Sequence, residues 1–348
     1  MISKVREKGE LVRRFILEHI ERHAADIAAL AADKFGITRQ AVNKHLTRLR
    51  EQGTITIEGA GRASSYKLVQ LFEQTFSYVI AASLAEDFVW LQDIKDAISP
   101  LPDNVLNIWH HGFTEMFNNA IDHSSGTTIA VKITKTAIST EIIISDDGVG
   151  IFKKIQSEFG LFDERHAIFE LAKGKLTTDP RNHSGEGIFF TSRMYDKFEI
   201  LSGGLYFNHE RGKPEDWLLE RSRAHSGTAV FMELDNHTAR TTRKVFDEFT
   251  ESDDYTFDKT IVPVNLARYG ADELVSRSQA KRLLARVELF KHVIFDFKDV
   301  ESIGQAFADQ IFRVFAREHP EIKLVPLNTN AEVANMVKRA LAAVSTNQ

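Results

Sequence analysis

Hydrophobic residues recur at helical spacing through the first fifty residues of the chain. The spacing predicts helices over residues 6–22 and 25–34. Thr38 is a typical N-cap for a third helix over residues 39–52, which Gly53 would end. Two short strands, TITIEG and SSYKLV, follow. The pattern therefore predicts three helices and a two-stranded ribbon at the start of the chain.

A second helical pattern, HGFTEMFNNAIDHS over residues 111–124, has an unusual polar face. With a period of 3.6 residues, the apolar side chains share one face, and Glu115, Asn119, Asp122 and His123 lie opposite. A helix with only a structural role would usually carry long, solvated charges there. These short side chains bind metals and accept protons, so we expect this face to meet a ligand.

Two glycine-containing strings follow this helix. The alternation in TTIAVKITKT predicts a strand, and a second strand, EIIIS, runs directly into DDGVG from Asp146 to Gly150. Farther on, SGEGIFF opens a helix with Gly185 and Gly187 at its start, which would offer free N–H groups to a phosphate. Each string alone is common in ordinary turns. There is no GxxxxGK[ST] sequence, so a P-loop is excluded.

The rest of the pattern sets the expected domain boundaries. Aromatic-rich residues after the ribbon favour a mostly helical connector, and the polar string ESDDYTFDKT favours a linker. Strands and helices alternate beyond it, which predicts a small α/β layer. The chain is thus predicted to be a multidomain α+β protein, divided into residues 1–70, 71–102, 103–250 and 251–348.

Composition and charge narrow the function. The absence of cysteine excludes disulfides, cysteine nucleophiles and thiolate zinc sites. With no apolar run of roughly 18 residues and no signal peptide pattern, a cytoplasmic protein without a membrane segment is expected. Residues 1–69 carry 13 Lys and Arg against 8 Asp and Glu, a charge of +5, so with −5 overall the remainder carries −10. A basic segment on an acidic body suggests an anionic partner.

The first 70 residues resemble the winged helix-turn-helix family. The resemblance lies in ITRQAVNKHLTRLREQGTITIEGAGRASSYKL, which runs from the turn through the recognition helix to the wing. It implies binding of double-stranded DNA, as a homodimer if the half-sites are paired. A winged helix that binds protein is the alternative. The side chains that would face the groove or its phosphates are Arg39, Gln40, Asn43, Lys44 and Arg48, with Arg62 at the wing tip.

Residues 103–250 resemble the GHKL (Bergerat-fold) ATPases, an α/β sandwich family that includes histidine kinases, gyrase and anti-sigma-factor serine kinases. The resemblance rests on EMFNNAIDH, DDGVG, GEG and the pair Gly227–Thr228, in that order. It implies ATP and Mg²⁺ as ligands, with residues 152–184 as a lid. The nucleotide-binding residues would be Asn119, Asp122, His123, Asp146, Gly148, Gly150, Lys175, Thr177, Gly185, Gly187 and Thr228.

The same resemblance implies three specific roles. Asn119 would coordinate Mg²⁺ through its amide oxygen. Asp146 would accept a hydrogen bond from the adenine amino group. Glu115 would orient and deprotonate the attacking water or hydroxyl. A Glu115 that helps to bind the nucleotide without supporting turnover is the alternative.

The string RSQAKRLLARVELFKHVIFDFKDVESIGQAFADQIFRVF resembles the STAS-like (DUF4325-type) domains that are fused to such ATPases. Antagonists related to these domains carry a phosphorylatable serine after the strand, where this chain has Gln305 and Ala306. This departure argues against phosphorylation of the domain as a switch. The predicted function is an ATP-responsive transcriptional regulator with a protein partner for the STAS-like domain. The alternative is an anti-sigma-type serine/threonine kinase that acts on a partner protein.

Overall fold

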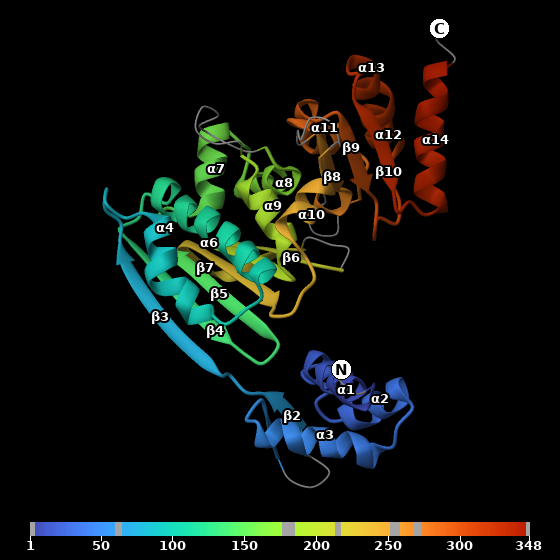
Figure 1. The fold of residues 1–348 in the computed structure, drawn as a ribbon. Helices are drawn as coiled ribbons and strands as arrows, with labels where there is room; N and C mark the ends of the chain where they lie inside the picture. Colours follow the sequence, from blue (N-terminus) through green and yellow to red (C-terminus); the bar gives the residue numbers. More distant parts are fainter. Residues whose placement is uncertain are drawn as a thin grey trace.

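The described part of the chain has two separate hydrophobic cores, one in the N-terminal unit and one in the rest. Figure 1 shows the N-terminal unit below the rest of the molecule. The computed structural model describes residues 4–59, 65–175, 185–212, 217–250, 258–267 and 273–345. Within this part the architecture is mixed α/β, with a two-stranded, a three-stranded and a five-stranded sheet. No helix in the described ranges combines the length and the apolar character needed to cross a membrane.

The N-terminal unit has the predicted order of elements. Val12, Ile16, Val42 and Leu46 are fully or almost fully buried and join its helices. The Thr38 hydroxyl accepts a hydrogen bond from the Ala41 N–H at 3.2 Å, which confirms the predicted N-cap. Its elements are α1 (Lys4–His19), α2 (Ile27–Phe35), α3 (Arg39–Glu51) and the antiparallel strands β1 (Ile55–Glu58) and β2 (Ser65–Leu68).

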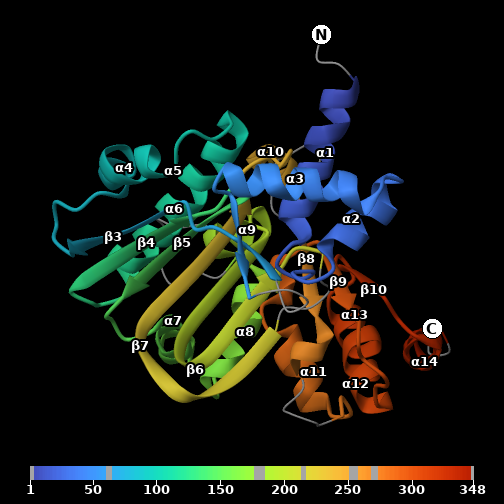
Figure 2. The same cartoon turned by 90° about the horizontal axis from the view of Figure 1, so that it is seen from below.

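The central unit is a five-stranded antiparallel sheet with helices on one face (Figures 1 and 2). Ile129, Ile133 and Ile142 alternate with partly exposed residues along two adjacent strands and are fully buried on the helical side. In spatial order the strands are β3 (Phe72–Val79), β4 (Thr128–Lys135), β5 (Ser139–Asp146), β7 (Trp217–Asp235) and β6 (Lys197–Glu210). The helices are α6 (Asp103–His123), α7 (Ile151–Phe159), α8 (Glu164–Lys173), α9 (Gly187–Met194) and α10 (Thr242–Asp247).

The connector predicted to be helical over residues 71–102 is wrong in its first part. Residues 72–79 form the edge strand β3, which pairs with β4 along its whole length. Phe72, Phe76 and Tyr78 alternate with polar residues, a period of two that fits a strand. The remainder is helical as predicted, in α4 (Glu86–Val89), the π-helical η2 (Trp90–Ile94) and α5 (Lys95–Ile98). The central sheet therefore begins at β3, well before residue 103.

The C-terminal unit is the predicted small α/β layer. Its three parallel strands lie in the order β10-β9-β8, and their core is continuous with that of the central unit. Its first α-helix, α11 (Arg277–Leu284), ends shortly before Arg286, which adopts a left-handed backbone conformation with φ of 58°. Of the linker predicted over residues 251–260, residues 251–257 lie outside the described residues, and Lys259 and Thr260 begin the strand β8 (Lys259–Pro263).

The elements of this unit follow one another in βα order, with two short 3-10 turns. They are β8 (Lys259–Pro263), η3 (Val264–Ala267), α11 (Arg277–Leu284), η4 (Val287–Leu289), β9 (His292–Asp296), α12 (Gln305–Asp309), η5 (Gln310–Phe315), α13 (Ala316–Glu318), β10 (Lys323–Leu327) and α14 (Ala331–Ser345).

Candidate functional site

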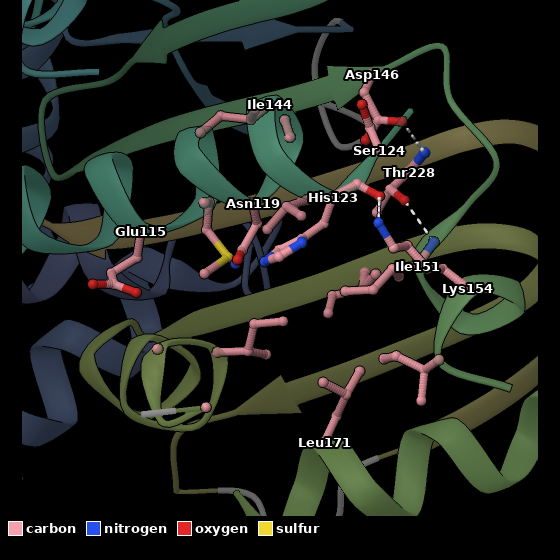
Figure 3. Close-up of a pocket in the computed structure, with 18 of the residues that line it drawn as sticks. Glu115, Asn119, His123, Ser124, Ile144, Asp146, Ile151, Lys154, Leu171 and Thr228 are labelled. Carbon is pink, nitrogen blue, oxygen red and sulfur yellow. Dashed lines mark hydrogen bonds between the residues drawn. The ribbon is translucent and has the colours of Figure 1, made fainter. Parts of the chain in front are cut away.

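A pocket of about 300 Å³ opens between the central sheet and its helices (Figure 3). It is bounded by α6, the end of β5, α7, α8 and the start of α9. The predicted nucleotide-site residues that line it are Glu115, Asn119, His123, Asp146, Gly185, Gly187 and Thr228. Residues that are far apart in the sequence thus converge on one cavity.

Helix α6 supplies one wall of the pocket. Spacings of four residues place Glu115, Asn119 and His123 along one side of the helix, as Figure 3 shows. Phe113 and Phe117 are fully buried in the hydrophobic core of the central unit. The predicted ligand-facing side of the helix is therefore the side that lines the pocket. Asp122, which was predicted to join this set, is exposed and does not line the pocket.

Asp146 is held in place at the end of β5. Its Oδ1 accepts hydrogen bonds from the Gly148 N–H at 2.9 Å and the Thr228 N–H at 3.2 Å. A Cβ atom on Gly227 would lie 2.0 Å from the Asp146 carbonyl oxygen, and φ at Gly227 is +74°. Only glycine permits this approach without a shift. These contacts fix the Asp146 carboxylate at the pocket.

Thr228 and Gly150 complete this end of the pocket. The Thr228 hydroxyl accepts a hydrogen bond from the Ile151 N–H at 2.9 Å, which ties β7 to the start of α7 (Figure 3). Gly150 is the N-cap residue of α7 and has φ of 88°. Gly148 and Gly150 do not line the pocket themselves. Their contribution is to the turn that carries Asp146.

The neighbouring Asp147 has a different task. Its carboxylate accepts hydrogen bonds from the side chain and N–H of Thr127 and from the N–H of Thr128. The Thr127 hydroxyl is the main cause that holds the pKa of Asp147 well below its usual range, followed by the two backbone N–H groups. Asp147 therefore fixes the start of β4 and is not part of the pocket lining.

The N-terminus of α9 opens into the pocket. Gly187 is its first residue, and Glu186 at the N-cap makes no side-chain capping hydrogen bond. A Cβ atom on Gly187 would lie 2.1 Å from Oε2 of Glu115, so the carboxylate lies directly against the helix end. Backbone N–H groups and the helix dipole make such an end attractive to anions. Glu115 and Asp146 lie toward opposite ends of the pocket wall (Figure 3).

Lys154 lines the pocket and was not predicted. Its Nζ donates a hydrogen bond to the His123 carbonyl oxygen at 2.8 Å and lies 3.8 Å from Oε1 of Glu158 (Figure 3 shows the first contact). The helical pattern of IFKKIQSEF after Gly150 indicates that Lys154 lies on a helix next to the predicted site. The assignment of residues 152–184 to a lid obscured it, whereas most of that segment forms α7 and α8.

Lys175 was predicted as a nucleotide-binding residue but does not line the pocket. Lys175 points to the C-terminal unit, where its Nζ donates to the Leu289 carbonyl oxygen at 3.0 Å and lies 3.7 Å from Asp258. Thr177 lies outside the described residues. Among the described residues, no group of three or more His, Asp or Glu side chains could hold a metal ion. A metal at this site would therefore need oxygens from a ligand as well as from Asn119.

The predicted DNA-facing residues share the exposed surface of α3. Arg39, Gln40, Asn43, Lys44 and Arg48 are all exposed. The opposite side of the helix packs into the N-terminal core. Arg48 also borders a groove between this unit and the turn after β4. Arg62 lies outside the described residues.

Comparison with known families identifies the C-terminal part. Residues 279–334 match the sequence profile of a family described as a STAS-like domain of unknown function (DUF4325). The predicted STAS-like domain is thereby confirmed over these residues. No curated protein matches the chain.

Proposed function

We propose that this protein is a cytoplasmic, ATP-responsive transcriptional regulator, with a GHKL-type nucleotide site between a winged helix and a STAS-like domain. One observation carries the proposal. A single pocket joins a fixed carboxylate, Asp146, to the N-terminus of α9. A carboxylate is suited to accept a hydrogen bond from an adenine amino group, and a helix N-terminus is suited to bind phosphates.

The residues at the phosphate end fit a Mg²⁺ ion that bridges protein and nucleotide. Mg²⁺ prefers oxygen ligands and often takes only one or two from the protein, the rest coming from phosphates and water. Asn119 would supply one amide oxygen, and its place on α6 between Glu115 and His123 puts it in the same wall. When bound, the ion would neutralise phosphate charge.

Glu115 is the residue that we expect to handle a proton. Its carboxylate lies against the first residue of α9, which is the end of the pocket proposed to hold phosphates. At this place a carboxylate would accept a proton from an attacking hydroxyl group. The same position serves hydrolysis, if water attacks, or a protein kinase reaction, if a partner's serine or threonine attacks.

Measurements of phosphate release and of phosphate transfer to a partner protein distinguish hydrolysis from the protein kinase reaction. We expect the chain to release phosphate slowly from Mg-ATP, with loss of release in Glu115→Gln and retained nucleotide binding. Labelling of a partner protein by [γ-³²P]ATP, also lost in Glu115→Gln, would support the kinase alternative. Binding without either reaction would make the protein a nucleotide sensor.

The proposed effect of nucleotide binding at this site is a change in DNA binding by the winged helix. Its exposed, basic α3 favours double-stranded DNA as the partner. We expect Mg-ATP to change DNA affinity, measured by fluorescence anisotropy with labelled duplex. DNA affinity that is identical with and without a saturating nucleotide would contradict a regulatory role. The STAS-like domain is the proposed docking site for a protein.

A further inference from the structure

The STAS-like domain and the central unit meet at Arg286. This residue follows α11 and lies within the matched residues 279–334. Its Nη2 donates a hydrogen bond to the Lys175 carbonyl oxygen at 2.8 Å, just beyond the end of α8. Its Nε lies 3.5 Å from Oε2 of Glu170 on the same helix. One side chain from the STAS-like domain thus holds both a carbonyl group and a carboxylate of the central unit.

The carboxylate that Arg286 meets is deeply buried. Glu170 is 3% exposed, and its other oxygen is 2.9 Å from Nζ of Lys173, which is 1% exposed. Buried charges are stable only when they are paired, and removal of one partner leaves an uncompensated charge. Lys173 in turn donates to the Ala285 carbonyl oxygen. Groups from the STAS-like domain and from the central unit therefore fix the end of α8 together.

The same arginine also touches the wall of the nucleotide pocket. Its guanidinium carbon lies 5.0 Å from the centre of the Phe159 ring, a cation–π contact. Phe159 lines the pocket from α7, and Leu171 lines it from α8. A shift of Arg286 would therefore act directly on Phe159, and on Leu171 through the adjacent Glu170 of α8.

The backbone of Arg286 supports a special role. Its φ of 58° lies in the left-handed region, which is unfavourable for a residue other than glycine or asparagine. Such conformations persist when the surrounding contacts hold them in place, and they gather at functional sites. Here those contacts are the three made by the guanidinium group with Lys175, Glu170 and Phe159.

We infer that Arg286 is a positioning residue for the nucleotide pocket, supplied by the STAS-like domain. The inference rests on the proposed function of the pocket. Arg286 sets the position of α8 and of the Phe159 ring, and through them the affinity for nucleotide. Because such coupling is reciprocal, nucleotide binding also stabilises this contact of the STAS-like domain with α8.

The test uses the full-length protein and three variants. Arg286→Gly removes the side chain and suits the left-handed backbone, so its effect reports the side chain alone. Arg286→Lys keeps the charge but loses the planar guanidinium. Arg317→Ala, on exposed α13 of the same domain, is the matched control. For each protein, hydrogen exchange of residues 164–173 is measured without ligand, and Mg-AMP-PNP affinity is measured by calorimetry.

We expect Arg286→Gly to speed exchange in α8 and to weaken Mg-AMP-PNP binding by about 10-fold, a usual size for such coupling. Arg286→Lys should recover part of both effects, and Arg317→Ala should match the wild type. Unchanged α8 exchange in Arg286→Gly, or faster exchange with unchanged affinity, would overturn the inference. A wild-type chain that binds no nucleotide would overturn the proposed function instead, and the exchange comparison would then decide the positioning of α8 by itself.

Discussion

Two adjacent aspartates at the end of β5 have different roles because their local contacts differ. Asp146 and Asp147 are both carboxylates, and the sequence offers no spacing rule that separates them. In the structure Asp147 accepts hydrogen bonds from Thr127 and Thr128. Asp146 lines the pocket and accepts hydrogen bonds from the N–H groups of Gly148 and Thr228. Asp146 is the last residue of β5, whereas Asp147 follows the strand.

A substitution at Gly187 tests the contact between the start of α9 and Glu115. A Cβ atom there would lie 2.1 Å from Oε2 of Glu115, so Gly187→Ala must displace the carboxylate or the start of α9. We expect Mg-ATP affinity to fall roughly 10-fold or more, since overpacking typically costs about 1–3 kcal/mol. Calorimetry is the measurement.

Gly9→Ala is the control for this substitution. Gly9 lies within α1, where a Cβ atom would meet neighbours only at 3.5 Å, an ordinary contact distance. We expect it to bind Mg-ATP like the wild type and to be slightly more stable, because alanine favours helix over glycine. Equal Mg-ATP affinity in Gly187→Ala and Gly9→Ala would show that the start of α9 is not part of the nucleotide site.

At the scale of elements, periodicity predicted α3 and the βα alternation of the C-terminal unit, because each carries a clear period and recognisable ends. The helix predicted over residues 111–124 is the C-terminal half of α6, which begins at Asp103. It failed at β3, where the aromatic residues Phe72 and Phe76 favoured a helical connector. Their burial depends on pairing with β4, a contact distant in sequence. Lys154 was missed for a related reason, since its role depends on the meeting of α6 and α7.

His111, in the middle of α6, leads to a prediction on pH. His111 has a pKa below its ordinary 6.5, mainly because burial disfavours the charged form, and its neighbour His110 adds to the effect. In the unfolded chain His111 takes up a proton as pH falls through about 6.5, whereas in the folded chain it does so only at lower pH. Protonation therefore favours the unfolded state, and stability should decline from pH 7 towards pH 5.

His111→Gln tests this assignment. We expect the urea midpoint of the wild type to fall more between pH 7.5 and pH 5.5 than that of His111→Gln, because the variant lacks this titrating group. The comparison uses the difference between the two pH values in each protein, so a constant effect of the substitution on stability cancels. The same pH dependence in both proteins would show that His111 is not responsible.

At the scale of the whole molecule, the N-terminal unit is joined to the central unit by weak charge pairs. Arg14 lies 3.7 Å from Asp235, and Arg22 lies 3.3 Å from Glu210, with both arginines largely exposed. Exposed pairs of this kind contribute little and are screened by salt. The STAS-like domain, by contrast, shares a continuous hydrophobic core with the central unit. A regulatory movement is therefore easier for the winged helix than for the STAS-like domain.

The DNA surface can be tested without disturbing the nucleotide pocket. We expect the double variant Arg39→Ala/Lys44→Ala to lose about 10-fold or more in affinity for duplex DNA, because both exposed cations face the proposed groove. Mg-ATP affinity should be unchanged, since neither residue lines the pocket. Wild-type DNA binding should also weaken steeply as salt rises. Loss of both activities in the variant would show that the pair is structural.

The most direct test of the central claim is calorimetry of Mg-ATP binding to the wild type, Asp146→Asn and Asp147→Asn. The account predicts binding by the wild type and a loss of roughly 10-fold to 100-fold in Asp146→Asn, because a charge-assisted hydrogen bond is removed. Asp147→Asn should retain the affinity and melt at a lower temperature, because its amide nitrogen cannot accept the hydrogen bond that the Thr127 hydroxyl donates to Oδ2. No binding by the wild type, or equal affinity in the two variants, would contradict the assignment of this pocket to a nucleotide.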